Sequence, residues 1–415
     1  MLSNETKDRI SPLIKEIPLI ISESSLRNDI DDLLAMTPYL SNGCSFAVVD
    51  DINTTDIFGN RVFSALRKHS KNRHISFEAS PTASMDNVNY IRQKSMYCDA
   101  IIAVGSGTIN DLCKYAAYLD KKPYVVFPTA ASMNGYLSAS ASIEVDGHKS
   151  SQQANLPKAV FCDLQIIAQA PVRLTRSGLG DCLARPTAQC DWLLSRLLLA
   201  TNYIEDVFLI QHDIEEEVFE NASAIAKTDF DITKKLLELL LISGLGMTAA
   251  KGSYPASQGE HMIAHCYNML QNNRNEHNRN VIPLHGEEIG ITSLYMAELQ
   301  ENLLKKELKL KDTIFNIDEI KNFYGSELTI EFSLLFEKKQ KLLMEKREKI
   351  KEANWDDVKS EIEKIMMGAP QIESILKKAG CHTKLENIGW NREDFNKALS
   401  TARFSRDRFT FLDLE

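Results

Sequence analysis

The sequence predicts an α/β domain followed by an all-helical domain, and three observations support this fold class. From about residue 44 to 165, short apolar runs rich in β-branched residues alternate with helical stretches. After about residue 168 the strand-like runs stop, and apolar residues recur three and four positions apart, the spacing of a buried helix face. The chain has 415 residues, 44% of them hydrophobic, which is enough for two cores. We therefore expect an α/β domain over residues 1–168 and an all-helical domain over residues 169–415.

Five apolar segments in the first part have the length and composition of buried strands. They are residues 44–50, 74–80, 99–105, 123–129 and 159–164. The segments between the first four are long enough for crossover helices, which predicts a mostly parallel, Rossmann-like sheet. Residues 139–153 alternate polar and apolar side chains around Asp146-Gly147, a typical turn dipeptide, and predict a β-hairpin before the last strand.

The second part contains apolar segments with helical periodicity, at residues 181–200, 232–250 and 333–353. The charged stretch from 302 to 352 is typical of a pair of solvated helices. A surface that binds a partner is the alternative interpretation of that stretch.

The formal net charge of −9 argues against nucleic acid as a partner, because no run of Lys and Arg lacks interleaved acidic residues. The first twenty residues hold no uninterrupted apolar run, so we expect neither a signal peptide nor membrane insertion, and a cytoplasmic location. Eight scattered cysteines without a C-x-x-C pair are typical of free, buried thiols.

The first chemical motif is a glycine-rich turn after the third predicted strand. Gly105, Ser106 and Gly107 end that strand, and a helix is expected to begin near Thr108 to Asp111. Glycines allow a pyrophosphate to approach the backbone, and a helix start offers unpaired N–H groups to it. Such turns are common, and this one lacks the full dinucleotide-binding pattern.

Two further strand ends strengthen the cofactor hypothesis. Asp50 ends the first predicted strand and could accept hydrogen bonds from a ribose, while Thr129 to Ser132 follow the fourth. The carboxyl ends of parallel strands share one edge of a sheet, so these loops could face one elongated ligand. A turn or a helix cap is the alternative role for Asp50 or Asp51.

The second chemical motif lies in the helical part. Gly180-Asp181 is followed by the segments 260–265 (EHMIAH) and 284–288 (LHGEE), which place three histidines among apolar residues. Two histidines and one carboxylate form a metal-binding set that leaves positions open for substrate. His261 and His265 are one helical turn apart, and the spacing does not decide which of them is the ligand. A hydrogen-bonded core histidine is the alternative for each one taken singly.

Taken together, these motifs resemble the iron-containing alcohol dehydrogenase and dehydroquinate synthase superfamily, and within it the sn-glycerol-1-phosphate dehydrogenases. The likeness rests on five segments in order between about residues 44 and 300, with a fainter match at 409–415. The five are 103–115 (AVGSGTINDLCKY), 128–143 (PTAASMNGYLSASASI), 177–192 (SGLGDCLARPTAQCDW), 251–265 (KGSYPASQGEHMIAH) and 284–291 (LHGEEIGI).

The resemblance implies a dehydroquinate synthase-like fold and assigns roles to residues. It implies Asp181, His261 and His285 as ligands of one divalent metal, zinc first, with iron or nickel as alternatives. It implies His265 as the histidine that contacts substrate, with Asp181 beside it in catalysis. It also implies that NAD or NADP is held by Asp50, Gly105, Ser106, Gly107, Thr108, Asn110, Asp111, Thr129, Ala130, Ser132 and Ser138. An acidic residue at position 50 favours NAD over NADP, and the family pattern implies a homodimer or larger homo-oligomer.

Two residues depart from the family pattern. Asn134 stands where members usually have an acidic residue that contacts substrate, so it keeps hydrogen-bonding reach but cannot act as a base. Arg185 follows the Gly-Asp motif closely and could bind a phosphate or carboxylate of the substrate. A solvent-facing helix residue is the alternative for Arg185.

The sequence therefore predicts a metal-dependent, NAD(P)-linked dehydrogenase that interconverts sn-glycerol 1-phosphate and dihydroxyacetone phosphate, or a related polyol phosphate. We expect a metal-bound substrate oxygen, hydride exchange with the nicotinamide, and proton transfer by His265 or a water relay. Three alternatives remain: a dehydrogenase of unphosphorylated glycerol or another polyol, a dehydroquinate-synthase-like cyclase, and an inactive cofactor-binding relative.

Overall fold

A computed structural model describes residues 4–26, 30, 34, 37, 44–66, 72–145, 148–274, 282–312 and 314–415. The chain divides into two compact units. Unit 1 comprises Met1–Gly178 and Leu209–Gly252, and unit 2 comprises Leu179–Phe208 and Ser253–Glu415. The predicted division between residues 168 and 169 stays a prediction, because these units interleave along the chain.

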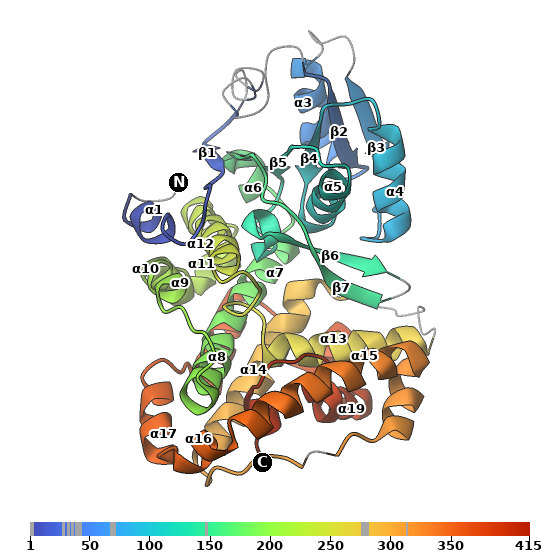
Figure 1. The fold of residues 1–415 in the computed structure, drawn as a ribbon. Coiled ribbons are helices and arrows are strands. Elements are labelled where there is room, and N and C mark those ends of the chain that lie inside the picture. The colour runs from blue at the N-terminus through green and yellow to red at the C-terminus, as the bar shows by residue number, and fades with distance from the viewer. Residues whose placement is uncertain are drawn as a thin grey trace. The chain divides into compact units, whose positions relative to one another are not determined.

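Unit 1 is built on a parallel sheet with the strand order β1-β8-β5-β4-β2-β3 in the described residues (Figure 1). Its strands are β1 (Leu19–Glu23), β2 (Phe46–Asp51), β3 (Arg73–Phe77), β4 (Ala100–Gly105), β5 (Tyr124–Pro128) and β8 (Ala159–Asp163). The central strands β2, β4 and β5 are buried at every position, which explains their uninterrupted apolar runs. All five predicted strands are present.

The sequence prediction missed the edge strand β1. It pairs in parallel with β8, with Leu19 opposite Ala159. Its residues are only partly buried, so the segment lacks the fully apolar run that marks the central strands.

The predicted hairpin is also present, as an antiparallel pair outside the main sheet. It consists of β6 (Ser140–Val145) and β7 (His148–Gln153), with Val145 opposite His148. The predicted turn dipeptide Asp146-Gly147 lies outside the described residues.

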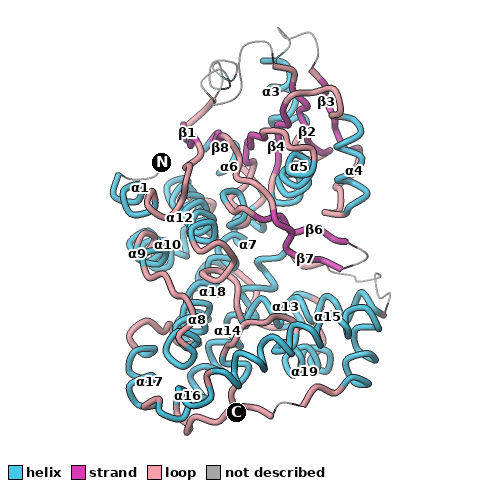
Figure 2. Tube along the Cα trace, in the orientation of Figure 1, coloured by secondary structure: helices cyan, strands magenta, loops and turns pink. Residues whose placement is uncertain are grey.

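Helices cover the sheet of unit 1, and further helices follow its last strand in the chain (Figure 2). They are α1 (Asn4–Ile10), η1 (Thr55–Gly59), α3 (Asn60–Ala65), α4 (Met85–Lys94), α5 (Gly107–Leu119), η3 (Asn134–Leu137), α6 (Leu164–Ala168), α10 (His212–Glu220), α11 (Ala222–Ile225) and α12 (Phe230–Ala249). Helix α12 belongs here because it packs on η3: a Cβ at Gly244 would lie 2.6 Å from the Asn134 carbonyl oxygen. Only glycine allows this approach.

Two helices cross the boundary between the units, α7 (Val172–Cys182) and α9 (Asp206–Leu209). The elements of unit 2 in the described residues are helices joined by loops. Its helices are α8 (Ala184–Leu199), α13 (Gly259–Asn273), α14 (His285–Leu304), α15 (Ile317–Glu345), α16 (Arg347–Glu352), α17 (Trp355–Glu363), α18 (Ala369–Ala379), η4 (Leu385–Ile388), α19 (Arg392–Thr401), η5 (Ala402–Phe404) and η6 (Phe411–Asp413).

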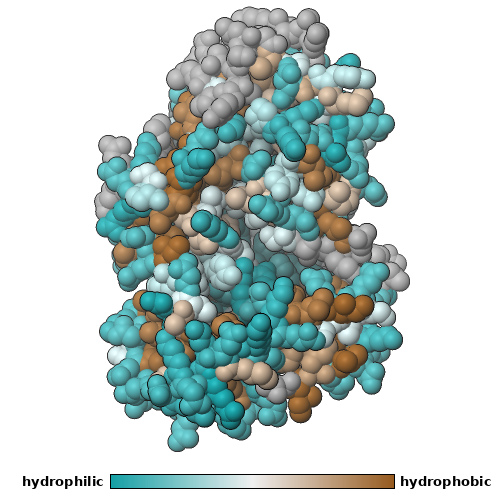
Figure 3. All heavy atoms as spheres, viewed as in Figure 1, coloured by the Kyte–Doolittle hydropathy of each residue, from teal (hydrophilic) through white to brown (hydrophobic). Residues whose placement is uncertain are grey.

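The charged stretch of the sequence forms the end of α14 together with α15 and α16. Helix α15 is kinked at Gly325, and on both sides of the kink it buries residues four positions apart in the core of unit 2: Ile320 and Tyr324 before it, and Leu328, Phe332 and Phe336 after it. Helix α16 has no buried residue, and the surface around α16 and α17 is mainly hydrophilic (Figure 3). The solvated helices expected from the sequence are therefore present.

The structure confirms the predicted fold class, a parallel α/β sheet with a hairpin and a helical second part. All eight cysteines are free, and six of them are buried, as expected. No described helix is both long and apolar enough to cross a membrane.

Candidate functional site

Three side chains of unit 2 converge on one point. Asp181 lies at the end of α7, His261 in the first turn of α13, and His285 is the first residue of α14. One ligand atom from each lies within 4.8 Å of the other two. His265, one turn further along α13, is not part of this group. The arrangement separates the two histidines that the sequence spacing could not separate.

The distances within this triad suit a metal ion. Oδ1 of Asp181 lies 3.8 Å from Nε2 of His261 and 3.7 Å from Nε2 of His285. Tetrahedral zinc with ligand bonds near 2.1 Å sets ligand atoms about 3.4 Å apart, so a small inward movement closes the set. Asp181 and His261 are 2% and 5% exposed, and His285 is partly exposed. Three protein ligands with one accessible side leave room for a substrate oxygen.

A glycine brings two of the helices together at the triad. A Cβ placed on Gly180 would lie 2.0 Å from the carbonyl oxygen of Gly286, which is far inside contact distance. The end of α7 can therefore touch the start of α14 only without a side chain at position 180. This contact places Asp181 beside His285.

A buried carboxylate orients His261. Glu260 accepts a hydrogen bond from Nδ1 of His261 at 3.0 Å, and it also accepts from Thr187 Oγ1 at 3.1 Å and from the Gln258 N–H at 2.7 Å. A proton on Nδ1 leaves the Nε2 lone pair directed toward Asp181, as a metal ligand requires. Burial opposes the charge of Glu260, yet the hydrogen bond and charge of His261 lower the pKa of this carboxyl.

His265 stands beside the triad. Its ring centroid lies 5.8 Å from that of His261 and 6.2 Å from that of His285. Its Nδ1 lies 3.5 Å from Nη2 of Arg406. A histidine at this distance can contact a substrate bound at the triad without being a metal ligand.

Two arginines near His265 were missed by the sequence prediction. Arg406 and Arg408 both donate hydrogen bonds to the carbonyl oxygen of Ser257, so their guanidinium groups are neighbours. Burial and repulsion from Arg408 lower the pKa of Arg406 to about 9. The S-R-D-R segment was the available signal, but Arg406 is 141 positions from His265, so spacing could not connect the two.

In unit 1 the glycine-rich turn has the expected local structure. Gly105 ends β4, and Ser106 is the N-cap of α5 without a side-chain capping bond. The first N–H groups of this 13-residue helix are thus not covered by the cap side chain. Thr108 lies in the first turn, where the positive end of the helix dipole would favour a phosphate.

The loop after β5 lies next to this turn, as predicted from the parallel strand order. The Thr129 N–H donates to the Gly105 carbonyl at 3.2 Å. Ala130 accepts from the Tyr136 hydroxyl at 2.8 Å, and Ser132 is 8% exposed. The residues of both loops therefore lie at one sheet edge.

Lys114 contacts the segment that contains Ser138 and Ser140, and the sequence prediction did not single it out. It is fully buried on α5, and its Nζ donates to the Ser140 carbonyl at 3.0 Å and to Ser138 Oγ at 3.3 Å. Ser138 itself donates to the Gly135 carbonyl at 3.0 Å. Burial lowers the pKa of Lys114, an effect that Asp111 opposes. Ser138 is thus already engaged by the protein.

The two acidic residues of the cofactor prediction are also engaged within unit 1. Asp50 is fully buried and bonds to His74 Nε2 at 2.6 Å and Thr55 Oγ1 at 2.7 Å. Asp111 accepts from the Ser142 N–H at 2.9 Å and from Asn110 Nδ2 at 2.9 Å. Asp51 caps the following turn, the alternative role considered for this pair. The geometry does not give Asp50 an open face for a ribose.

The two departures from the family pattern lie in different units. Asn134 begins the short helix η3 of unit 1. Arg185 is the second residue of α8 in unit 2 and donates to Gln189 Oε1 at 2.5 Å, while Gln189 Nε2 donates to the Tyr203 hydroxyl at 3.1 Å. Arg185 is therefore tied to its own helix.

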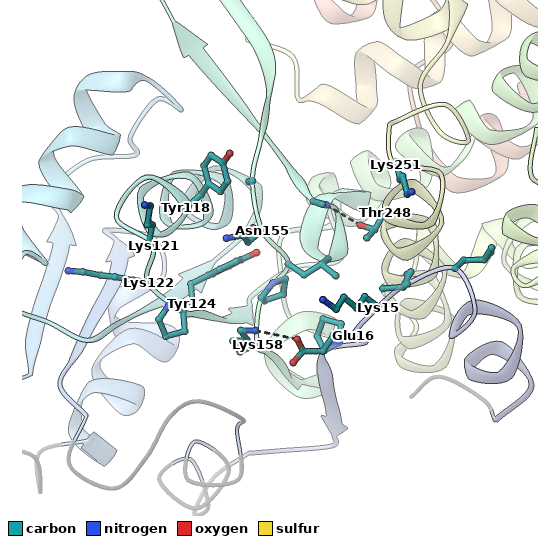
Figure 4. A pocket seen from close by; sticks show the side chains of 18 of the residues that line it. Lys15, Glu16, Tyr118, Lys121, Lys122, Tyr124, Asn155, Lys158, Thr248 and Lys251 are labelled. Carbon is teal, nitrogen blue, oxygen red and sulfur yellow. Dashed lines mark hydrogen bonds and ion pairs between the residues drawn. The ribbon is translucent and has the colours of Figure 1, made fainter. Parts of the chain in front are cut away.

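A cavity of about 1200 Å³ lies in unit 1 (Figure 4). It opens at the amino ends of β1, β5 and β8, the sheet edge opposite to the glycine turn. Five lysines and one glutamate line it, and Lys158 approaches Glu16 to 3.5 Å. It contains none of the predicted site residues.

Comparisons with known proteins agree with the resemblance. Residues 25–171 match the family model described as iron-containing alcohol dehydrogenase. A glycerol-1-phosphate dehydrogenase [NAD(P)+] of Bacillus subtilis is 31% identical over 296 residues, which cover 70% of this chain and 74% of that protein. The enzyme of the same name from Thermococcus sibiricus is 30% identical over 309 residues, 74% of this chain and 84% of that protein.

Some of the relatives are matched over a shorter part of their length. The chain spans 65% of the glycerol-1-phosphate dehydrogenase of Bacillus licheniformis, at 31% identity over 62% of this chain. It spans 52% and 43% of two further bacterial proteins of that name.

Solved structures share the fold. A probable glycerol dehydrogenase from Sinorhizobium meliloti superposes with a TM-score of 0.61 at 18% identity, covering 93% of this chain and 89% of that one. A sulfoacetaldehyde reductase from Bifidobacterium kashiwanohense, solved with NAD+, gives 0.58 at 16% identity over 93% and 90% of the two chains.

Proposed function

Because the chain belongs to the iron-containing alcohol dehydrogenase family, we propose that it is a metal-dependent, NAD(P)-linked dehydrogenase of a polyol phosphate. The substrate pair that we propose is sn-glycerol 1-phosphate and dihydroxyacetone phosphate, as the names of the sequence relatives suggest. The observation that carries the proposal is the Asp181, His261 and His285 triad, whose ligand atoms lie within 4.8 Å of one another. Two imidazoles and a carboxylate are borderline ligands, for which zinc is our first choice of metal, with iron or nickel possible.

Each residue of the triad region has a defined task in this proposal. Asp181, His261 and His285 hold the metal, which when bound supplies Lewis-acid polarisation of a substrate oxygen. Glu260 keeps the His261 ring in the orientation of a ligand. His265, close to the triad but outside it, accepts or donates the proton of the substrate hydroxyl, directly or through a water.

The cofactor tasks belong to unit 1. The N–H groups at the start of α5, with Gly105, Ser106, Gly107 and Thr108, bind the pyrophosphate of NAD(P), which supplies the hydride acceptor. Thr129, Ala130 and Ser132 line the same sheet edge. Lys114 and Asp111 hold this loop in place through Ser138 and Ser142, respectively. We assign Asp50 and Ser138 a supporting role, because each is engaged by neighbouring residues.

The experiment that tests the proposal is an assay of dihydroxyacetone phosphate reduction, with NADH and with NADPH, in the presence of zinc, iron or nickel. We expect oxidation of the nicotinamide with at least one metal. Turnover only with dihydroxyacetone would indicate the unphosphorylated polyol dehydrogenase. A cyclase would show no net change in NADH with its own substrate, because it regenerates its cofactor. If the protein binds no metal and shows no turnover with any combination of nicotinamide and metal, this result would favour an inactive relative and contradict the proposal.

A further inference from the structure

Arg406 and Arg408 are two neighbouring positive charges on which the carboxylates of Glu260 and Asp407 act without forming an ion pair. Neither guanidinium has a carboxylate oxygen within 4 Å among the described residues. Both arginines donate hydrogen bonds to neutral acceptors: the Ser257 carbonyl for both, Ser257 Oγ at 2.9 Å for Arg406, and Ser253 Oγ at 3.1 Å for Arg408. Partly buried like charges in contact repel each other, which costs stability unless an anion is present.

Local structure holds this pair in position. Both arginines reach the turn Ser253–Ser257, which leads directly into α13 and its histidines. The Arg408 guanidinium stacks on the Tyr254 ring at 4.0 Å from its centroid. Stacking fixes the plane of the guanidinium and leaves its N–H groups directed along that plane, and a pair of guanidinium groups suits the oxygens of a phosphate.

The pair also lies at the right place relative to the metal ligands. Nη2 of Arg406 is 3.5 Å from Nδ1 of His265, and the His265 ring is 5.8 Å from the His261 ring. Arg406 of the positive pair and His261 of the triad therefore both lie close to His265. A three-carbon substrate with an oxygen at the triad could extend past His265 and place a terminal phosphate at the arginines.

We propose that Arg406 and Arg408 form the binding site for the phosphate group of the substrate. The proposal rests on the proposed function, because it takes the triad as the site of the reacting oxygen. Arg406 and Arg408 take the role of phosphate contact that was expected for Arg185, because Arg185 donates a hydrogen bond to Gln189 on its own helix.

The test compares a phosphorylated substrate with its unphosphorylated counterpart. Metal-loaded wild type, Arg406→Gln and Arg408→Gln are assayed with dihydroxyacetone phosphate and with dihydroxyacetone. Each variant should lower kcat/KM for dihydroxyacetone phosphate about 10- to 100-fold, because hydrogen bonds to a charged group contribute that much. The kcat/KM for dihydroxyacetone should change less than about threefold. Arg392→Gln, on the exposed start of α19, is the matched control and should leave both values unchanged.

A binding measurement separates this proposal from the proposed function. Calorimetry with inorganic phosphate is performed on metal-stripped protein, so that no metal can hold the anion. Wild type and Arg392→Gln should bind phosphate, and the two site variants should bind it at least tenfold more weakly. Should wild type lack dehydrogenase activity, the proposed function fails and this titration still decides the phosphate site. Equal phosphate affinity in all four proteins, or an equal loss of kcat/KM with both substrates, would overturn the inference.

Discussion

At the scale of single residues, the account depends on His261 being a metal ligand. Replacing His261 by alanine removes one of three ligands, and the remaining pair is a weak site. We expect His261→Ala to lose bound metal and turnover while keeping its helical content, measured by elemental analysis and circular dichroism. His382→Ala, at an exposed position of the same unit, should retain metal and activity. A His261→Ala protein that binds one equivalent of metal would remove this residue from the ligand set.

Glu260 should influence the metal without touching it. Glutamine at this position keeps the size of the side chain but can no longer hold His261 with a full carboxylate charge. We expect Glu260→Gln to weaken metal binding about 10- to 100-fold, the usual effect of removing a partner of a metal-bound histidine. A competition titration with a chelator measures this, with Glu298→Gln on the exposed face of α14 as the control. Unchanged affinity would show that Glu260 serves only the packing of α13.

At the residue level, the Gly-Asp and histidine motifs indicated a metal site, but their spacing did not decide between His261 and His265. Only the grouping of Asp181, His261 and His285 in space separates the two histidines. The position of Arg406 at this site could not be predicted from the sequence, because its partner His265 is 141 positions away and only the fold brings them together. Asp50 shows the reverse case: an acidic residue at a strand end suggests a ribose, yet His74 and Thr55 occupy its carboxylate.

At the scale of elements, the contact between α7 and α14 sets the geometry of the triad. Alanine at position 180 would force a Cβ to within 2.0 Å of the Gly286 carbonyl, so one helix must move. We expect Gly180→Ala to destabilise the fold by about 1–3 kcal/mol and to weaken metal binding. Urea unfolding and a metal titration would measure the two effects. Arg173→Ala, at an exposed position of α7, should change neither, and normal metal affinity in Gly180→Ala would contradict this role.

Asp191 links three elements of unit 2 and should make stability depend on pH. On α8 it accepts hydrogen bonds from the backbone of Gly259 at 2.9 Å and of Phe411 at 3.0 Å. Burial, with the nearby charge of Glu260, raises the pKa of Asp191 to about 8. The folded state therefore keeps a proton that the unfolded state releases above its pKa of 3.8, so this contribution to stability is lost as pH rises toward 8.

The corresponding variant is Asp191→Asn, which cannot titrate. The free energy of unfolding of wild type should fall more steeply than that of Asp191→Asn between about pH 5 and about pH 7.5, by up to about 1.4 kcal/mol per pH unit. Urea titrations of both proteins across this range provide the comparison. Parallel pH profiles for the two proteins would exclude a titrating Asp191.

The elements also show where sequence patterns stop being informative. The central strands were predictable because burial on both faces requires continuous apolar runs. The edge strand β1 is half exposed and lacks that signal. Helix α12 was recognised as a helix, but periodicity does not tell which core a helix joins, and its contact with η3 assigns it to unit 1.

At the scale of the whole molecule, metal binding should stabilise the protein. The three proposed ligands lie near the end of α7, on α13 and on α14, so a bound ion would link three elements that are distant in sequence. We expect zinc to raise the unfolding free energy by about 2.7 kcal/mol when free metal is at one hundred times Kd. Thermal melts with chelator and with zinc would reveal this, and His261→Ala should show no difference between them. Equal melting temperatures for wild type would argue against a site formed by the folded chain.

The most direct test of the central claim is metal reconstitution of activity. Wild-type protein is stripped of metal, and dihydroxyacetone phosphate reduction is followed while metal is added back in known amounts. Turnover should be absent at the start, rise in proportion to added metal, and level off at one equivalent per chain. A turnover rate that is the same in stripped and reconstituted protein would contradict a metal-dependent dehydrogenase at Asp181, His261 and His285.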